Sequence, residues 1–220
     1  MRTDADDDAA CYGDGCADFY DEIYPPPSRT ALSCLKRLAG DGPLLEAGVG
    51  TGRYALPLAA HGIPVHGIDA SAAMLAVLRR KPGAAAIGIT LGDFSRVAAP
   101  GRFSLVVCLV DTLSLLPDAR RQAQAVARFA AALLPHGHLL LETTFSMSDE
   151  ATTRNVDIAL STRSGLRMYR VRRSALDAQL LDDWAADAGL ERIARWRDWR
   201  GEDWNGECSP ALSLYRRKDR

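Results

Sequence analysis

The feature that most constrains the fold is a glycine-rich segment at residues 44–52, which reads Leu-Leu-Glu-Ala-Gly-Val-Gly-Thr-Gly. Its apolar start predicts a strand, and the residues from about Arg53 onward predict a helix. Glycine at every second position removes Cβ, so the backbone can adopt positive φ and a ligand can approach it closely. Open α/β sheets bind ligands at such junctions, at the carboxyl ends of their strands. The segment therefore indicates a nucleotide-cofactor loop.

Strand and helix patterns alternate on both sides of this loop. We expect strands at 44–48, 63–69, 85–91, 103–110 and 138–144, and helices at 28–38, 53–62, from Ser71 onward and at 118–134. A turn is expected at 135–137. Five alternations at this spacing suit right-handed βαβ units and are too few for an eight-stranded barrel. The pattern predicts a doubly wound α/β sheet.

The pattern changes after residue 150. Segments 155–161 and 166–173 flank Ser164-Gly165, which predicts a hairpin. An amphipathic helix at 175–188 and strands at 190–199 and 211–216 follow. No internal repeat or interdomain linker is visible. We expect one domain over 12–220, with a hairpin insertion at 154–173.

The N-terminal region divides into two parts. Residues 1–11 are rich in aspartate and are expected to form a disordered acidic tail. Residues 12–40 are expected to form an N-terminal lid and a helix. Tyr20 and Tyr24 share one helical face, and the prolines at 25–27 end that helix. The aromatic segment is either a lid over a ligand or a helix packed on the domain surface.

Composition narrows the class of function. The formal net charge is −1, which gives no general attraction to nucleic acid or to anionic membranes. No apolar run approaches the roughly 20 residues that span a bilayer. The five cysteines are odd in number and match no zinc spacing. We therefore expect a cytoplasmic protein with no metal, no nucleic-acid partner and no membrane partner.

Three acidic residues lie at successive strand ends: Glu46, Asp69 and Asp93. Asp69 follows the middle glycine by 19 residues, a distance suited to binding a ribose diol. Asp93 could accept a hydrogen bond from an exocyclic amine. Met74 and Phe94 could enclose a flat base between them. The set predicts a nucleoside site along one rim of the sheet.

These motifs resemble those of the class I S-adenosylmethionine-dependent methyltransferases. Residues 46–53 are similar to motif I of that family, E-x-G-x-G-T-G-R, and the segments at 69–75, 92–94 and 106–116 resemble its later motifs in the right order. The resemblance covers about residues 18–217. It implies a Rossmann-like, seven-stranded, mostly parallel sheet in which antiparallel strand 7 lies between strands 5 and 6. A dinucleotide fingerprint needs a third glycine at position 53, which is arginine.

The resemblance also implies roles for individual residues. The glycines pass close to the methionine part of the cofactor, Asp69 binds the ribose, and the backbone at 109–110 receives the methionine ammonium. Tyr20 or Arg29 reaches the carboxylate. The implied cofactor contacts are Tyr20, Arg29, Glu46, Ala47, Gly48, Gly50, Gly52, Asp69, Ala70, Met74, Asp93, Phe94, Leu109 and Val110.

The acceptor side is less defined by motifs. Asp111 follows strand 4 directly and is the candidate catalytic residue, although it departs from the N/D-P-P-Y signature of many amino-group and nucleic-acid methylating enzymes. The arginine-rich segment 163–173 is either a clamp for an anionic acceptor or a solvated hairpin. The candidate substrate contacts are Tyr24, Asp111, Thr144, Phe145, Tyr169 and Arg170.

The sequence thus predicts a methyltransferase of the bacterial small-molecule type. It moves a methyl group from S-adenosyl-L-methionine to N, O or C of an acceptor, for which we expect a secondary metabolite. Methyl transfer from a sulfonium depends mainly on positioning and on excluding water. Two alternatives stay open: a cofactor-dependent reaction without methylation, such as a cyclisation, and a cofactor-binding partner without catalysis. We expect a monomer or a homodimer.

Overall fold

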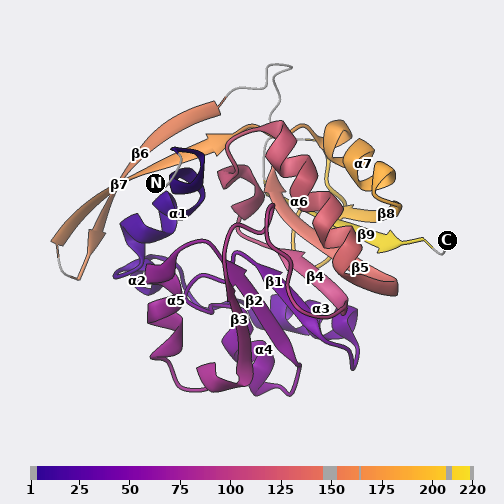
Figure 1. Ribbon diagram of the computed structural model, residues 1–220, viewed down its shortest axis with the longest axis horizontal. Helices are drawn as coiled ribbons and strands as arrows, with labels where there is room; N and C mark the ends of the chain where they lie inside the picture. The colour runs from indigo at the N-terminus through magenta and orange to yellow at the C-terminus, as the bar shows by residue number, and fades with distance from the viewer. Residues whose placement is uncertain (1–3, 146–152, 164, 207–209, 219–220) are drawn as a thin grey trace.

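The computed structural model of the chain describes residues 4–145, 153–163, 165–206 and 210–218. Its main sheet has seven strands in the order β3-β2-β1-β4-β5-β9-β8 (Figure 1). The strands are β1 Leu44–Ala47, β2 Val65–Asp69, β3 Ile87–Leu91, β4 Phe103–Cys108, β5 Leu133–Thr144, β8 Leu190–Trp196 and β9 Pro210–Arg217. Strand β9 pairs antiparallel with both β5 and β8, and the pairs from β3 to β5 are parallel. The predicted seven-stranded sheet is confirmed.

Helices cover both faces of this sheet. They are α3 Arg29–Ala39, α4 Ala55–Ala60, α5 Ala72–Arg79, α6 Ala119–Ala132 and α7 Ala178–Asp187, with short 3-10 turns η1 Ala84–Ala86 and η2 Thr112–Leu115. The hydroxyl of Ser71 accepts a hydrogen bond from Met74 N at 3.0 Å and so caps α5 at the pocket rim. The arrangement is the predicted doubly wound one.

The central strand β4 shows why its sequence is almost continuously apolar. Val106 and Cys108 pack into the core cluster that contains α6 and α7. Leu105 and Val107 pack into the opposite cluster, beneath α3, α4 and α5. Side chains alternate between the two faces of a strand, and both faces of this one are covered by helices. The sheet is therefore buried from both sides, and its functional edge is the rim at its carboxyl ends.

Strand β5 begins earlier than predicted, at Leu133 instead of residue 138, and α6 ends at Ala132. The predicted turn at 135–137 lies inside β5. His136 has φ +60°, and the register with β4 shifts between Phe103 and Leu105. Pairing with β4 continues across this irregularity. Pro135 and Gly137 therefore lie at an irregularity near the start of β5, and they do not form a turn between two elements.

The N-terminal region and the hairpin form a second layer beside the rim (Figure 1). Helix α1 covers Asp4–Cys16 and α2 covers Tyr20–Ile23, so residues 4–11 of the tail that we expected to be disordered over 1–11 are helical, and residues 1–3 lie outside the described residues. The end of α1 packs against α5 and β7, contacts that no local sequence pattern reports. Strands β6 Thr153–Thr162 and β7 Gly165–Ser174 pair along their whole length, as expected of a hairpin over 154–173. Ser164 of the predicted turn lies outside the described residues.

Two kinds of feature are absent from the described residues. No helix among them combines the length and apolar character needed to cross a bilayer. Nor do they contain a group of three or more His, Cys, Asp or Glu side chains placed to hold a metal ion.

Candidate functional site

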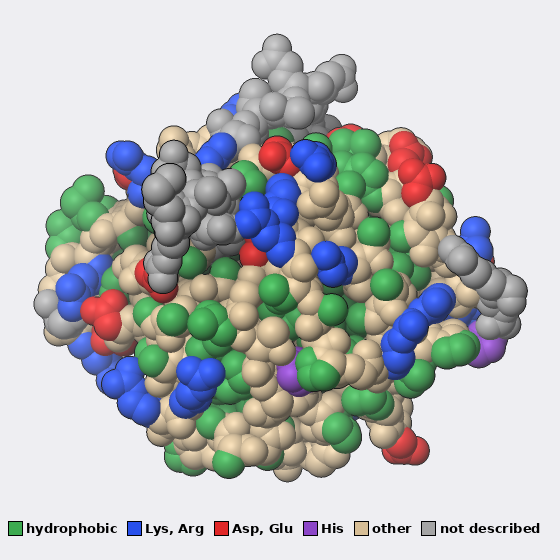
Figure 2. All heavy atoms as spheres, viewed as in Figure 1, with side chains coloured by type: hydrophobic (Ala, Val, Ile, Leu, Met, Phe, Trp, Pro, Cys, Tyr) green, Lys and Arg blue, Asp and Glu red, His purple; other side chains and the backbone are tan. Residues whose placement is uncertain are grey.

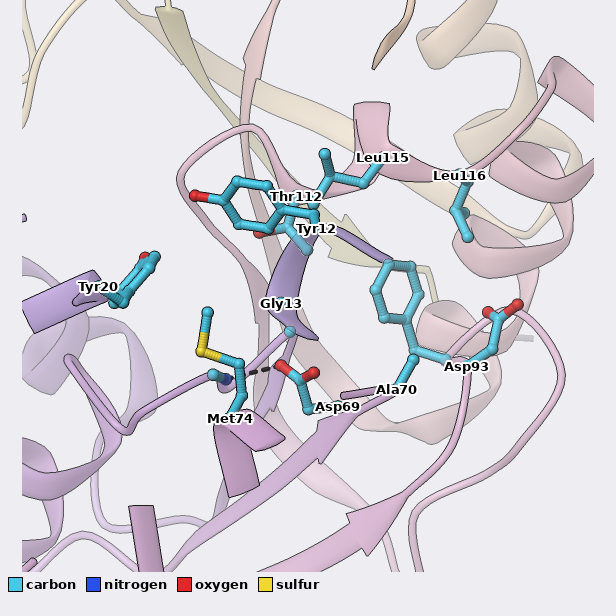
Figure 3. A pocket seen from close by; sticks show the side chains of 13 residues that line it. Tyr12, Gly13, Tyr20, Asp69, Ala70, Met74, Asp93, Thr112, Leu115 and Leu116 are labelled. Carbon is cyan, nitrogen blue, oxygen red and sulfur yellow. Dashed lines mark hydrogen bonds between the residues drawn. The ribbon is translucent and has the colours of Figure 1, made fainter. Parts of the chain in front are cut away.

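A pocket opens at the carboxyl ends of the parallel strands, beneath the N-terminal helices (Figure 3). The space between its lining atoms, including the part open to solvent, is about 570 Å³. Figure 3 shows Asp69 and Met74 on one side, with Tyr12 and Thr112 opposite. The lining residues are Tyr12, Gly13, Tyr20, Gly48, Gly50, Asp69, Ala70, Met74, Asp93, Phe94, Thr112, Leu115 and Leu116. Eight of the implied cofactor contacts are in this set.

Asp69 at the end of β2 joins the glycine turn to the start of α5. Its Oδ2 accepts a hydrogen bond from Gly50 N at 2.7 Å, and its Oδ1 accepts one from Ser71 N at 2.9 Å. Burial raises the pKa of this carboxyl to about 6, and the N–H groups of Ser71 and Gly50 oppose that rise. Each carboxylate oxygen has a second lone pair free for another donor. The group can therefore accept from a pair of ligand hydroxyls.

Met74 and Phe94 provide apolar surfaces on two sides of the pocket. Met74 is buried with the N-terminal helices, and Phe94 packs against Phe129 with ring centroids 5.6 Å apart. Phe94 also belongs to the core cluster beneath α6. This packing restricts both side chains, so the space between them is a preformed slot that suits a planar ligand group.

Asp93 lines the pocket, and hydrogen bonds and an ion pair within the protein hold its carboxylate in place. Its Oδ1 accepts from the N–H and the hydroxyl of Ser95, at 2.8 and 2.7 Å. Its Oδ2 lies 2.7 Å from Nη2 of Arg121. A carboxylate can accept about four hydrogen bonds, so one position remains for a ligand amine. The sequence predicted an amine acceptor here and did not predict the ion pair that orients it.

Glu46 lies behind the pocket wall at the end of β1. The side chain is buried, and its Oε2 has no hydrogen-bond partner. Burial, reinforced by the charge of Asp69, raises the pKa of the Glu46 carboxyl to about 8. Buried polar atoms normally have partners, and an unpartnered carboxylate oxygen suits a cationic donor. This is the observation that best fits the ammonium of a methionine moiety.

Side chains of neighbouring elements lie close to the backbone of the glycine turn. Gly48 has φ +79°, and a Cβ built on it would overlap the Thr112 methyl group. Gly52 has φ +83°, and its Cβ would overlap Leu78 of α5. Gly48 therefore allows close approach at the pocket, whereas Gly52 allows a helix to pack. The family resemblance had implied that both glycines contact the cofactor.

Several implied cofactor contacts lie outside the pocket lining. Ala47 and Leu109 are core residues, and Arg29 is exposed at the start of α3. Val110 donates its N–H to Oε2 of Glu142 at 2.8 Å. A backbone role for 109–110 toward the cofactor stays a prediction.

The N-terminal helices cover the pocket through Tyr12, Gly13 and Tyr20. A Cβ on Gly13 would lie 2.5 Å from Cβ of Ser71, so α1 meets the start of α5 at a distance that only glycine allows. Farther along, Asp21 accepts a hydrogen bond from the Thr51 hydroxyl at 2.7 Å and pairs with Lys81 at 2.6 Å. Tyr12 and Gly13 lie at the start of the lid segment predicted over 12–40, but sequence reasoning did not name them as site residues.

The tyrosines meet where α1 faces the hairpin. The Tyr12 hydroxyl donates to that of Tyr24 at 3.2 Å, and the Tyr12 and Tyr169 rings lie 5.9 Å apart. Burial raises the pKa of Tyr12, and it raises that of Tyr169 to about 12, so both phenols are neutral at physiological pH. This brings together two predicted substrate contacts, Tyr24 and Tyr169.

Two other predicted substrate contacts, Phe145 and Arg170, contact residues other than these tyrosines. Phe145 is buried in the core and packs on Trp204 with centroids 5.2 Å apart, and its assignment to the substrate stays a prediction. Arg170 lies on the face of β7 opposite Tyr169 and pairs with Asp157 at 2.7 Å, so it does not join the predicted clamp. Figure 2 shows basic, acidic and hydrophobic side chains mixed over the hairpin, at the left of the view.

Asp111 is not a free carboxylate at the pocket. Its Oδ1 accepts from Thr144 N at 3.0 Å, and its Oδ2 pairs with Nη1 of Arg173 at 2.7 Å. Burial raises the pKa of Asp111, while the Thr144 N–H and the Arg173 charge oppose the rise. Thr144 contributes through its backbone, and neither residue is among those that line the pocket. The geometry favours a structural role for Asp111 over the catalytic role predicted from sequence. Thr112, Leu115 and Leu116, which follow Asp111, do line the pocket and were missed.

The doubly wound sheet, the glycine turn and the acids along one rim define a nucleotide-cofactor-binding α/β protein. Comparison with known proteins is more specific. Residues 44–137 match a family model described as a methyltransferase domain. The structure superposes on the CcbJ methyltransferase from Streptomyces caelestis with a TM-score of 0.84 and 27% identity, covering 96% of this chain and 100% of that one.

Two further relatives carry named activities. A dTDP-3-amino-3,6-dideoxy-alpha-D-glucopyranose N,N-dimethyltransferase from Streptomyces fradiae is 34% identical over 99 residues, which make up 45% of this chain and 38% of that protein. The match thus spans less than half of the relative's length. CalS10, an amino pentose methyltransferase from Micromonospora echinaspora, shares the fold, with a TM-score of 0.64, 22% identity, and coverage of 85% of this chain and 88% of that one. The segment that matches the methyltransferase domain contains the glycine turn and Asp69, and the fold is that of the CcbJ methyltransferase, in agreement with the family that the motifs resemble.

Proposed function

We propose that this protein transfers a methyl group from S-adenosylmethionine to an amine on a sugar-bearing small molecule of secondary metabolism. The observation that carries the proposal is a pocket at the carboxyl ends of the strands whose lining includes Tyr12 and Tyr20, with the Tyr12 hydroxyl bonded to that of Tyr24. Relatives named as acting on amino sugars support the choice of nitrogen and of a sugar acceptor.

The cofactor side of the pocket has groups for each part of the donor. Asp69 is assigned to the ribose hydroxyls, and the slot between Met74 and Phe94 to the adenine. The remaining acceptor position on Asp93 is assigned to the exocyclic amine. The unpartnered Oε2 of Glu46 is assigned to the methionine ammonium. When bound, S-adenosylmethionine supplies an electrophilic methyl group on a sulfonium.

The chain's own contribution to the reaction is positioning and enclosure. The N-terminal helices close over the pocket and exclude water, which favours attack by the bound acceptor. A neutral amine needs no strong base in order to attack a sulfonium methyl group. This agrees with a site in which Asp111, the candidate catalytic residue, is already paired with Arg173. The tyrosine hydroxyls can donate to and accept from an acceptor's polar groups without changing charge.

The test is a panel of acceptors read by mass spectrometry for the gain of one methyl group. The panel pairs amino sugars, free, nucleotide-linked and glycosidic, with matched sugars in which hydroxyl replaces amine. Methylation of the amino members alone supports the proposal. Methylation confined to hydroxyl members contradicts it, and so does S-adenosylmethionine consumption that yields a cyclised product without an added methyl group. No turnover across the panel, with cofactor binding intact, would favour a non-catalytic partner.

Three finer points stay predictions from sequence. They are that the protein has no nucleic-acid or membrane partner, that it is a monomer or a homodimer, and that it is cytoplasmic.

A further inference from the structure

Two consecutive residues directly after β4 have left-handed backbone. Val110 has φ +55° and Asp111 has φ +57°, and His136 is the remaining non-glycine residue with positive φ in the described part of the chain. A β-branched residue such as valine rarely adopts this conformation. Such backbone persists only where the surroundings hold it, and it concentrates at functional sites. The turn at 110–111 therefore needs contacts that enforce it.

Strand β5 supplies those contacts, chiefly through Glu142. Val110 N donates to Glu142 Oε2 at 2.8 Å, and Asp111 N donates to Glu142 O at 3.1 Å. Thr144 N donates in return to Asp111 Oδ1 at 3.0 Å. Glu142 thus holds both residues of the turn, one by its side chain and one by its backbone. The half-buried carboxylate has no other role in the site described above.

The same turn is tied to the hairpin. Asp111 Oδ2 lies 2.7 Å from Nη1 of Arg173, near the end of β7. Alternate residues of a strand share a face, so Arg173 lies on the same side of β7 as Tyr169, the side that packs on the N-terminal helices. One ion pair therefore connects the segment that carries Thr112 into the cofactor pocket to the strand that carries Tyr169 to the acceptor side.

We propose that Glu142 and Arg173 are positioning residues for methyl transfer. Glu142 holds the strained turn, and Arg173 fastens β7 to it. Together they set the distance between the cofactor wall and the acceptor wall of the site. The inference deepens the proposed function and rests on it for the kinetic readouts below.

Arg173→Gln tests the link between the two walls. We expect the acceptor KM to rise and kcat to fall, with a loss of at least about tenfold in kcat/KM. Affinity for S-adenosylhomocysteine should stay within about twofold, because Arg173 is not among the residues that line the cofactor pocket. The matched control is Arg172→Gln, which removes the same charge from the neighbouring position on the opposite, exposed face of β7.

Glu142 is tested by a pair of substitutions. Glu142→Gln keeps an oxygen that accepts from Val110 N, whereas Glu142→Leu removes it. We expect the glutamine variant to retain kcat within a fewfold and the leucine variant to fall at least about tenfold below it. Thermal unfolding of each variant reports whether it folds. If Arg173→Gln does not fold, Arg173→Lys, which keeps the charge and loses the planar fork, takes its place.

Hydrogen exchange with S-adenosylhomocysteine bound tests the coupling without any acceptor. Arg173→Gln should speed amide exchange in both 110–116 and 165–174, and Arg172→Gln in neither. That result supports the coupling even if the acceptor panel shows no methylation. Faster exchange confined to 165–174 overturns it. Equal kinetic losses in Arg173→Gln and Arg172→Gln overturn it too, as does equal impairment of the two Glu142 variants.

Discussion

Replacing Asp69 with alanine should weaken cofactor binding by roughly 100-fold or more. The carboxylate is held by the N–H groups of Gly50 and Ser71, so its position in the pocket is set before any ligand binds. Hydrogen bonds to a charged group contribute about 1.5–3 kcal/mol each. Two ribose hydroxyls therefore account for at least about 3 kcal/mol, and about 1.4 kcal/mol corresponds to a factor of ten in affinity.

Asp69→Asn refines the same prediction. The carboxamide has nearly the same shape but can accept hydrogen bonds through one oxygen only. Its NH2 group would face one of the backbone N–H groups from which the carboxylate accepts a hydrogen bond. We expect an affinity between those of the wild type and the alanine variant, about tenfold below the wild type. An asparagine affinity equal to the wild-type value would show that charge on this side chain is not used.

The assay is calorimetric titration with S-adenosylhomocysteine at neutral pH, where the pKa of about 6 leaves Asp69 mostly ionised. The control is Asp177→Ala, which also removes a carboxylate that accepts from a backbone N–H, that of Leu180 at 2.8 Å, but on the exposed start of α7. It should leave the affinity unchanged. A folded Asp69→Ala protein that binds within about twofold of the wild type would refute the ribose assignment.

Four other outcomes follow from the geometry. Because the pKa of Glu46 is raised to about 8, its carboxyl is mostly protonated at neutral pH, and a cationic ligand should displace that proton. Calorimetry in buffers of different ionisation enthalpy should therefore detect proton release, which Glu46→Gln abolishes. The same raised pKa makes the unfolding free energy of the ligand-free protein fall as the pH rises from the ordinary glutamate value through about 8. Gly13→Ala should lower cofactor affinity severalfold by pushing α1 off α5, while Gly15→Ala on the same helix, whose Cβ would meet its nearest atom at 3.9 Å, should not. Gly48→Ala should destabilise the protein by about 1–3 kcal/mol in chemical denaturation, and adding Thr112→Ser, which removes the overlapping methyl group, should restore part of that loss.

The cofactor side of the site was readable from sequence because its residues are local to strand ends. Gly48, Gly50 and Asp69 each end or follow a strand whose apolar pattern is clear, and parallel strands bring their carboxyl ends to one rim. The strand order followed from the ordered motifs. Boundaries were less accurate where strand pairing overrode local signals, as at the start of β5, where Pro135 and Gly137 suggested a free turn.

The acceptor side was harder to predict, chiefly because the sequence did not show which residues of the hairpin share the covered face. Tyr169 and Arg170 are neighbours in sequence, yet one packs against the N-terminal helices and the other pairs with Asp157 in solvent. Side chains alternate along a strand, so an error of one position exchanges the buried and exposed sets. The pattern of the hairpin contains both arginines and apolar residues, and it did not show which face is covered.

By itself, the sequence determined the sheet, the glycine turn, and the donor that the pocket holds, because these depend on backbone geometry and periodicity within short segments. Only the tertiary structure decided what surrounds the donor. Tyr12 meets Tyr169, and Asp111 meets Arg173, across long stretches of chain. Such contacts depend on how α1 and the hairpin pack on the rim, and burial and pairing then decide which carboxylates remain available. Asp111, the candidate catalytic residue in the sequence, is paired with Arg173 in the fold for that reason.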